Sequence, residues 1–341
     1  MEENIKTLKD RSLKNVMIPG THNAGSYEFG QSRLDPRAML KKYVTCQDET
    51  VFNQLAYGIR YLDIRVSHEK VIRSPEKLWI VHGILRTEVS LADVLLQVRD
   101  FLEATTHEIV IIDFHRFERG FEDHPRDHQS NLIAKSRHNE VAELLESIVG
   151  HHIHRDYNGY NIRVGDLIRD GRRLVVGYAA NRFIREANYY PRVRHLWAEA
   201  DNTSRLQDYF ERMMCMVSGF EATSAMAQLT PTTWGVIFDK YGGLRKMAQD
   251  VNWIISEWFQ EKWWSCANIV ATDFFLGNNL IEVSVEANQR RPPVPVRRFT
   301  SFSPTANLKK RRRRGLSLTT NDSKENDPKD FPEEEDESMW A

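Results

Sequence analysis

The chain has 341 residues, of which 41% are hydrophobic and 28% charged, and its formal net charge is -1. This composition is typical of a folded globular protein and excludes a collagen, a coiled coil or a wholly disordered chain. A net charge near zero also argues against a general nucleic-acid binder, which usually carries a strongly basic domain. We therefore expect no nucleic acid among the partners.

Predicted strands and helices alternate along the first 290 residues. The candidate strands are short apolar runs at residues 15–19, 61–66, 78–81, 109–114, 174–178, 194–197 and 268–274. The candidate helices repeat apolar residues at helical spacing, at residues 90–105, 139–149, 204–214 and 244–259. This alternation predicts an α/β fold with parallel strands and right-handed crossovers. A closed barrel fits better than an open sheet, because polar residues follow several strands at the edge where (β/α) barrels hold their active sites.

The C-terminal segment differs from the rest of the chain. The apolar pattern fades after Glu286, and residues 291–341 contain 11 basic and 9 acidic residues sorted into blocks. A segment so poor in apolar residues cannot bury enough surface to offset its ordering entropy. We therefore expect one barrel domain at residues 1–290 and a disordered tail at residues 291–341.

The basic block of the tail runs from Lys309 to Arg314, and the acidic block runs from Glu333 to Glu337. The basic block has three interpretations: a nuclear import signal, a tether to the anionic cytoplasmic leaflet, or a solvated run of charges. Phosphorylation of Ser317 would weaken a tether, and the acidic block could fold back and mask it.

The three cysteines are Cys46, Cys215 and Cys266, and they lie far apart in the sequence. Their odd number and spacing predict neither a zinc site nor a disulfide framework. The polar N-terminus does not resemble a signal peptide, and no run of about 18 apolar residues occurs. These features predict a soluble, reduced and cytoplasmic protein.

Titratable side chains stand at or near the ends of several predicted strands. They are His22, Asp63, Arg65, His82, Asp113, His115 and Asp273. Two histidines can serve as general base and general acid, and an arginine can neutralise a phosphate. A carboxylate bonded to an imidazole fixes the tautomer of that imidazole. Such a set suits cleavage of a phosphodiester by an internal hydroxyl without a metal.

Each of these residues also has a purely structural interpretation. A strand-end histidine before a glycine, such as His82, commonly belongs to a turn. Asp63 and Arg65 lie two residues apart on one strand face and could form a structural ion pair. Asp113 and His115 could pair with neighbouring residues. Function is indicated only if these side chains converge in the fold.

Four motifs in this order resemble the X region of phosphatidylinositol-specific phospholipases C. They are IPGTHNAGSY, GIRYLDIRV, VHG and EIVIIDFHRF, and the strongest similarity spans residues 13–118, with a weaker part to about residue 285. The chain resembles the stand-alone X domain-containing proteins of animals, which lack the other modules of the signalling enzymes. The resemblance implies a distorted TIM barrel that cleaves a glycerophosphoinositol lipid.

The resemblance also implies residue roles. His22 would be the general base on the inositol 2-hydroxyl, and His82 the general acid toward the diacylglycerol oxygen. Asp63 matches an acidic residue of the second strand, and Asp273 matches the residue that orients the first histidine in bacterial enzymes. Five further residues are expected to bind the substrate: Asn23, His115, Tyr178, Trp197 and Asn202.

The calcium-dependent members of this family bind the ion through an asparagine and three carboxylates. Here Asn23 and Asp63 are present, but Arg65 and His115 occupy the other two positions. A positively charged guanidinium repels Ca²⁺, and this ion prefers six to eight oxygen ligands. The bacterial-type enzymes place an arginine at this position, so the resemblance implies that Arg65 replaces calcium. We predict no metal and no other cofactor.

Three functions remain open at this point. The first is a phosphodiesterase that releases diacylglycerol and inositol (cyclic) phosphate, as a monomer working peripherally at a membrane. The second is a catalytically weak barrel that binds inositol lipid or a protein partner, which His115 in place of a carboxylate motivates. The third is a Mg²⁺-dependent barrel for another phosphodiester, and the Asp63-x-Arg65 pair speaks against it.

Overall fold

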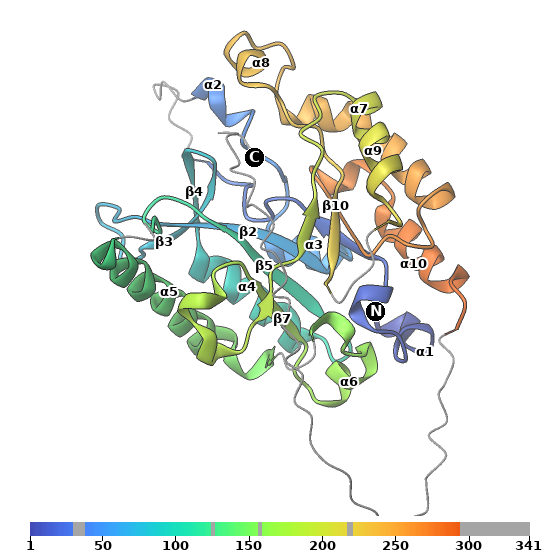
Figure 1. Ribbon diagram of the computed structural model, residues 1–341, viewed down its shortest axis with the longest axis horizontal. Coiled ribbons are helices and arrows are strands. Elements are labelled where there is room, and N and C mark those ends of the chain that lie inside the picture. The colour runs from blue at the N-terminus through green and yellow to red at the C-terminus, as the bar shows by residue number, and fades with distance from the viewer. Residues whose placement is uncertain (30–37, 124–126, 156–158, 217–220, 294–341) are drawn as a thin grey trace, which may run out of the picture. The chain divides into compact units, whose positions relative to one another are not determined.

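The predicted strands form one curled sheet in the computed structural model, which describes residues 1–29, 38–123, 127–155, 159–216 and 221–293 (Figure 1). The strands are β1 (Ile18–Thr21), β2 (Tyr61–His68), β3 (Leu78–His82), β4 (Leu85–Ser90), β5 (Val110–Phe117), β6 (Ile153–His154), β7 (Leu174–Tyr178), β8 (Tyr190–Pro191), β9 (Arg194–Leu196), β10 (Thr223–Met226) and β11 (Ile269–Thr272). Neighbours in the order β6-β7-β5-β2-β1-β11-β10-β9 are all parallel. The antiparallel hairpin of β3 and β4 extends β2, and β8 pairs with β7.

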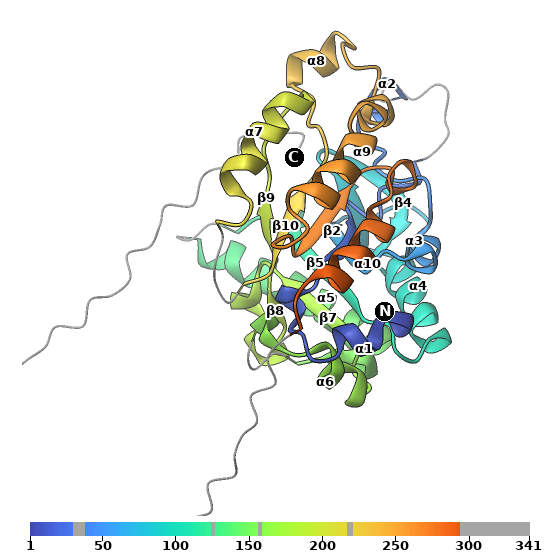
Figure 2. The same cartoon turned by 90° about the vertical axis from the view of Figure 1, so that its right-hand side faces the viewer.

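Helices cover the outside of this sheet (Figure 2). They are α1 (Ile5–Leu8), α2 (Ala38–Lys41), α3 (Val51–Tyr57), α4 (Leu91–Ala104), α5 (His128–Val149), α6 (Val164–Arg169), α7 (Thr203–Met213), α8 (Thr233–Ile237), α9 (Leu244–Glu261) and α10 (Leu280–Arg290). Helices α4 and α5 share a core with β2, β5 and β7, while α7, α9 and α10 share one with β10 and β11. Ser90 caps α4 through a capping box with Asp93.

The predicted distorted barrel is confirmed, although its closure differs from that of a regular barrel. Among the described residues, no backbone ladder joins β9 to β8. A side chain spans the gap instead: Oδ1 of Asp113, on β5, accepts a hydrogen bond of 3.1 Å from the backbone N–H of Val193, which precedes β9. The sheet is therefore a curled half-barrel held together in part by buried polar contacts.

Alternation along the strands decides which side chains face the barrel interior. On β2, Leu62 and Ile64 belong to the core beneath α4 and α5, so Asp63 and Arg65 point the other way. The parallel register places Asp63 beside Asp113 of β5. Charged groups from two strands thus meet inside the barrel, while the outer face of the same strands stays apolar.

Several predicted elements needed correction. The run at residues 78–81 is a strand, but it lies antiparallel to β2 rather than parallel. Helix α5 begins at His128, eleven residues before the predicted start, and β10 and α10 were not predicted at all. The expected domain boundary at residue 290 stays a prediction. Arg291, just beyond it, is buried and its guanidinium donates to the carbonyls of Trp264 and Ala267.

The cysteine prediction was wrong for two of the three residues. Cys215, just after α7, and Cys266, just before β11, form a disulfide across 51 residues of sequence. Cys46 is free and buried. Disulfides persist mainly in oxidising compartments, so this bond counts against the expected cytoplasmic location.

No helix in the described part of the chain combines the length and the apolar character needed to cross a bilayer. The blocks at Lys309–Arg314 and Glu333–Glu337, and Ser317 between them, lie outside the described residues. Their predicted roles remain predictions.

On the buried face of α5, His138 is surrounded by aromatic rings, and its Nδ1 lies 2.9 Å from the hydroxyl of Tyr178. Burial lowers the pKa of His138 to about 4, from the ordinary value of 6.5. The unfolded chain therefore binds this proton at a higher pH than the folded chain does. Stability must fall as the pH drops from about 6.5 toward 4.

We predict that replacing His138 by Gln reduces the loss of unfolding free energy between about pH 7 and pH 5, by on the order of 1–2 kcal/mol. Urea unfolding at the two pH values measures this loss. His128→Gln, at an exposed position of the same helix, should keep the dependence of the wild type. An unchanged pH dependence in His138→Gln would contradict the argument.

Candidate active site

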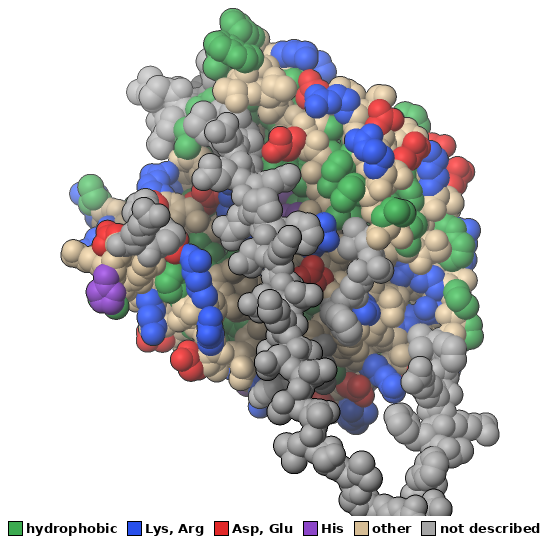
Figure 3. All heavy atoms as spheres, viewed as in Figure 1, with side chains coloured by type: hydrophobic (Ala, Val, Ile, Leu, Met, Phe, Trp, Pro, Cys, Tyr) green, Lys and Arg blue, Asp and Glu red, His purple; other side chains and the backbone are tan. Residues whose placement is uncertain are grey.

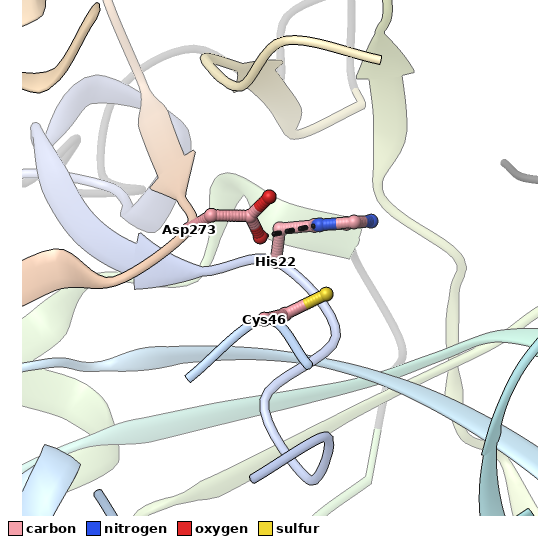
Figure 4. A group of neighbouring side chains, drawn as sticks. All are labelled: His22, Cys46 and Asp273. Carbon is pink, nitrogen blue, oxygen red and sulfur yellow. Dashed lines mark hydrogen bonds and ion pairs between the residues drawn. The ribbon is translucent and has the colours of Figure 1, made fainter. Parts of the chain in front are cut away.

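The ends of β1 and β11 bring a histidine and a carboxylate together. Thr21 lies opposite Thr272 in the parallel register, and the N–H of His22 donates to the carbonyl of Thr272. The next residues, His22 and Asp273, therefore leave the sheet side by side. Nδ1 of His22 lies 2.8 Å from Oδ1 of Asp273, and both side chains are almost fully buried (Figure 4).

This contact determines the tautomer of His22. Its Nδ1–H donates to the Asp273 carboxylate, so Nε2 carries the lone pair. Nη2 of Arg65 lies 3.0 Å from that Nε2 and can only donate. His22 thus has the geometry of a neutral general base that is oriented by a carboxylate on one side and faces a guanidinium on the other.

The surroundings of His22 contain one cation, one carboxylate and one amide, which belong to Arg65, Asp63 and Asn23. Arg65 Nη2 lies 4.0 Å from Asp63 Oδ2, which also accepts from the backbone N–H of Asn23 at 3.1 Å. Burial raises the pKa of Asp63, but Arg65 and the nearby histidines lower it more, so the net pKa is below the ordinary value. Asp63 is therefore a carboxylate that balances the charge of Arg65.

Several polar atoms of this group have no hydrogen-bond partner among the described residues. They are Nε and Nη1 of Arg65, Oδ1 and Nδ2 of Asn23, and Oδ1 of Asp63. Buried polar groups in proteins are almost always bonded, so unpaired ones call for an explanation. Two guanidinium donors and an amide donor beside a general base suit an anionic oxygen of a ligand.

His82 ends β3, next to Gly83, whose φ of 54° is a conformation that glycine adopts easily. Nδ1 of His82 lies 2.8 Å from the carbonyl oxygen of Val44, so Nδ1 carries a proton and Nε2 is the atom that exchanges one. The rings of His22 and His82 have centroids 5.7 Å apart and are nearly perpendicular. The two predicted catalytic histidines therefore lie on one site.

The segment from Val44 to Gln47 contacts both histidines, and the sequence analysis missed it. Val44 accepts from His82, and Sγ of Cys46 lies 3.3 Å from the same Nδ1. The amide of Gln47 donates to the carbonyls of His22 and Thr272, both at 2.9 Å. One buried segment thus holds His22, the strand end before Asp273 and His82 together.

The thiol of Cys46 lies beside the His22–Asp273 pair (Figure 4). Burial, reinforced by Asp273, raises the pKa of this thiol well above its ordinary value. Cys46 is therefore a neutral packing and hydrogen-bonding group here, because a nucleophilic cysteine needs a lowered pKa.

A second polar group adjoins the site on β2, β5 and β9. We call it the Asp113 cluster: Asp113, His115, His195 and Tyr61. Tyr61 donates to Asp113 Oδ2 at 2.9 Å and lies 2.9 Å from Nε2 of His195, and the rings of His115 and His195 stack with centroids 3.4 Å apart. Burial raises the pKa of Asp113, but hydrogen bonds from both histidines bring it well below its usual range. Burial and His115 lower the pKa of His195 to about 4, so His195 is neutral at pH 7.

The predicted substrate-binding residues lie in different parts of the structure. Asn23 lies in the site, and His115 lies in the adjoining Asp113 cluster, held by Asp113. Trp197 follows β9 and donates to Thr230 Oγ1. Asn202 is exposed and caps α7 by accepting from the N–H of Arg205. Neither of the last two contacts a residue of the histidine site in the described structure.

Tyr178 is not at the site, and its prediction is corrected. It is buried beneath α5, where its hydroxyl contacts His138. Asp113 faces inward and lies opposite Gly177 in the register of β5 and β7, so the next residue, Tyr178, must face outward. A Cβ at Gly177 would collide with Asp113 Oδ1, which shows why the inward position holds no side chain.

Three groups of His, Cys and acidic residues in the described structure could be considered for a metal: His22 with Cys46 and Asp273, the Asp113 cluster, and Glu103 with His151 and His152. In the Asp113 cluster the two imidazole planes differ by only 3° and stack face to face. An ion bound to both rings would have to lie in both planes, so this geometry does not fit a shared ion.

Calcium does not fit the His22 site either. Asn23 and Asp63 offer unpaired oxygens, but the positively charged Arg65 lies 4.0 Å from Asp63 and 3.0 Å from His22. Ca²⁺ needs six to eight oxygen ligands, which these residues do not supply. Independence from metal therefore stays a prediction that the donor set supports.

The curled parallel sheet is similar to the TIM barrel of phosphatidylinositol-specific phospholipases C. Residues 23–147 match the sequence profile of the phosphatidylinositol-specific phospholipase C, X domain. This stretch of the chain is therefore similar to the X domain of that family. The chain is similar over most of its length to the human PI-PLC X domain-containing protein 1, with 25% identity over 307 residues that cover 83% of this chain and 90% of that protein.

Other relatives match shorter parts. The human PI-PLC X domain-containing protein 2 is 30% identical over 126 residues, or 32% of this chain and 40% of that protein. A PI-PLC X-box domain-containing protein of Dictyostelium discoideum is 25% identical over 177 residues, which is 48% of this chain but only 21% of the relative.

Solved structures agree on the fold. The phosphatidylinositol-specific phospholipase C from Listeria monocytogenes superposes with a TM-score of 0.57 at 15% identity, covering 82% of this chain and 95% of that one. A Staphylococcus aureus phosphatidylinositol-specific phospholipase C gives 0.57 at 13% identity, covering 82% and 94%. At such identities the likeness shows the barrel and no more.

If His22 acts as a general base, we predict that Gln47→Ala lowers kcat about tenfold and changes KM less than about twofold, because the Gln47 amide holds the carbonyls of His22 and Thr272 in place. Phosphatidylinositol turnover measures both constants. Asn268→Ala is the matched control: its buried amide donates to the carbonyls of Leu13 and Val16 at the opposite end of the barrel. Both variants should melt earlier, but only Gln47→Ala should lose kcat; equal kcat losses would refute the positioning role.

Proposed function

We propose that this protein is a phosphodiesterase that cleaves phosphatidylinositol into diacylglycerol and inositol 1,2-cyclic phosphate. The observation that carries the proposal is His22 held between Asp273 and Arg65 and facing His82. The unpaired donors of Arg65 and Asn23 support it, because a phosphate would satisfy them.

The first half of the reaction uses His22. When a substrate phosphate binds, Arg65 turns its donors from His22 Nε2 to the phosphate oxygens. Nε2 then takes the proton of the inositol 2-hydroxyl while the 2-oxygen forms a bond to phosphorus. Asp273 accepts a hydrogen bond from Nδ1 and stabilises the imidazolium that results.

The second half uses His82. The bond between phosphorus and the diacylglycerol oxygen breaks, and protonated His82 gives its Nε2 proton to that oxygen. The carbonyl of Val44 holds the proton on Nδ1 and so directs the transfer to Nε2. Arg65 neutralises the charge on the phosphate oxygens, with Asp63 offsetting the guanidinium when no substrate is present.

A binding protein of low activity is the second candidate, and one contact favours it. Arg65 already occupies the lone pair of the base at 3.0 Å, so a chain in which this contact persists would bind lipid without turning it over. Lipid binding without product, unchanged in His82→Ala, would support this alternative.

We predict that His22→Ala and His82→Ala each lower turnover of phosphatidylinositol vesicles by about 10²–10⁴-fold, because each removes a proton-transfer group. Release of labelled inositol phosphate is the measurement. His128→Ala, at an exposed position on α5, should turn over at the wild-type rate. Equal rates in wild type and His22→Ala would defeat the proposal.

We also predict that an excess of a strong chelator leaves turnover unchanged, since Arg65 supplies the positive charge that calcium would otherwise supply. The assay is run with chelator, then with added Ca²⁺. Complete loss of turnover that Ca²⁺ restores would show that Arg65 does not replace the ion.

A further inference from the structure

Two histidines and a carboxylate lie close together outside the site described above. We call Glu103, His151 and His152 the His151 group. Each residue offers one ligand atom, and these atoms all lie within 4.8 Å of one another. Charges of both signs are interspersed on the face shown in Figure 3, so a single acidic or basic side chain indicates little. Two imidazoles with a carboxylate are more specific, because this is a ligand set that zinc takes in proteins.

The ends of two helices bring the group together. Glu103 lies in the last turn of α4, and His151 and His152 lie in the short 3-10 helix η3 (Gly150–His152), which follows α5 directly. Helices α4 and α5 pack against each other and share one core. The dipole of each helix places partial negative charge at its C-terminus, and this charge favours a cation near both ends.

The His151 group lies at the opposite edge of the sheet from His22. His152 directly precedes β6, whose Ile153 lies opposite Leu174 of β7, and Leu174 lies opposite Val110 at the start of β5. These positions are the amino ends of parallel strands. His22 follows the carboxyl end of β1, which is parallel to β2 and through it to β5. An ion in the His151 group would therefore not take part in chemistry at His22.

The two imidazole rings are oriented differently from the stacked pair in the Asp113 cluster. Their centroids lie 3.9 Å apart, and their planes are inclined by 42°. Inclined planes meet, so one ion can lie in both rings' planes. Nε2 of His151 lies 4.0 Å from Oε1 of Glu103, which is too long for a hydrogen bond. Two ligand atoms of a tetrahedral zinc ion lie about 3.4 Å apart, and small turns of these exposed side chains would close the difference.

The second histidine has a polar atom that calls for a ligand. His152 is only 7% exposed, and its Nε2 is buried without a hydrogen-bond partner among the described residues. Buried polar atoms almost always have a partner, so an unpaired one needs an explanation. A metal ion bound at Nε2 would supply the missing partner.

Two arginines near the group have other partners. Arg99 lies 3.9 Å from Glu103 but donates to Asp100 at 2.8 Å. Arg173, directly before β7, donates to two backbone carbonyls at and after the end of α4. Their charges weaken the attraction of the group for any cation. The site therefore favours a metal that binds neutral imidazole strongly over Ca²⁺ or Mg²⁺, which rely on oxygen ligands.

We propose that Glu103, His151 and His152 bind one Zn²⁺ ion, with water as the fourth ligand of a tetrahedral shell. The ion joins the end of α4 to the turn after α5 and so stabilises the folded barrel. It has no part in the proposed cleavage, and the inference does not rest on the proposed function.

The test is calorimetric titration of the full chain with zinc after treatment with a chelator. Glu103→Gln combined with His151→Ala removes two exposed ligands. This site variant should bind zinc at least about tenfold more weakly than wild type, since loss of a group that merely supports a ligand already costs about 10–100-fold. Glu2→Gln combined with His107→Ala is the matched control, because it removes an exposed pair 3.4 Å apart, and it should bind zinc as wild type does. Equal affinity of the site variant and wild type would overturn the proposal.

Two further titrations place the ion and identify its chemistry. His22→Ala should keep the zinc affinity of wild type. Loss of zinc in His22→Ala together with full affinity in the site variant would place the ion at the other end of the barrel and refute the proposal. An excess of Mg²⁺ should leave zinc bound, because the group depends on imidazole nitrogens. Ready displacement by Mg²⁺ would contradict that ligand set.

Melting temperature and turnover keep the metal site and the proposed function apart. Zinc should raise the melting temperature of wild type but not of the site variant, because an ion that binds the folded chain stabilises it. Turnover of the site variant, measured where it is fully folded, should equal that of wild type, and a loss there would refute the structural role. If wild type cleaves no phosphatidylinositol while zinc still raises its melting temperature through this group, the proposed function fails and the metal site stands.

Discussion

The hydrogen bond between His22 Nδ1 and Asp273 Oδ1 joins residues 251 positions apart in the chain. It exists only because β1 and β11 lie side by side in parallel, so that residues leaving both strands meet at one edge. Asn252 secures the second partner by donating to the carbonyls of Asp273 and Phe274. The proposed base is thus assembled by pairing the first strand with the last.

The sequence allowed prediction of those site residues that sit on regular strands or directly after them. Asp63 and Arg65 share a face because of alternation, and His22 follows a strand end whose motif is specific. Cys46 and Gln47 could not be predicted, because they lie in an irregular segment where periodicity says nothing about direction. The structure shows their importance only through contacts with His82 and the strand ends.

The errors in the fold have similar physical origins. The apolar run at residues 78–81 resembles a buried parallel strand, yet the short connection after His68 turns the chain back, so that β3 pairs antiparallel with β2. The start of α5 was missed because Leu132 and Ile133 are exposed and disturb the helical pattern. The Cys215–Cys266 bond leaves no mark in the sequence, since a separation of 51 residues belongs to no known spacing motif. In each case tertiary packing determines a feature of the structure that the local sequence pattern does not specify.

Arg65 connects the stability of the barrel with its proposed function. Its side chain is only 6% exposed, yet Nε and Nη1 lack partners among the described residues, and Asp63 is as far as 4.0 Å away. A buried guanidinium that is incompletely paired destabilises the folded state. A bound phosphate would supply the missing acceptors and would also draw Arg65 away from the lone pair of His22. Binding of the substrate would then pair these donors and free the proposed base in the same movement. The unpaired donors that destabilise the empty barrel are therefore the groups that would make it selective for an anionic diester.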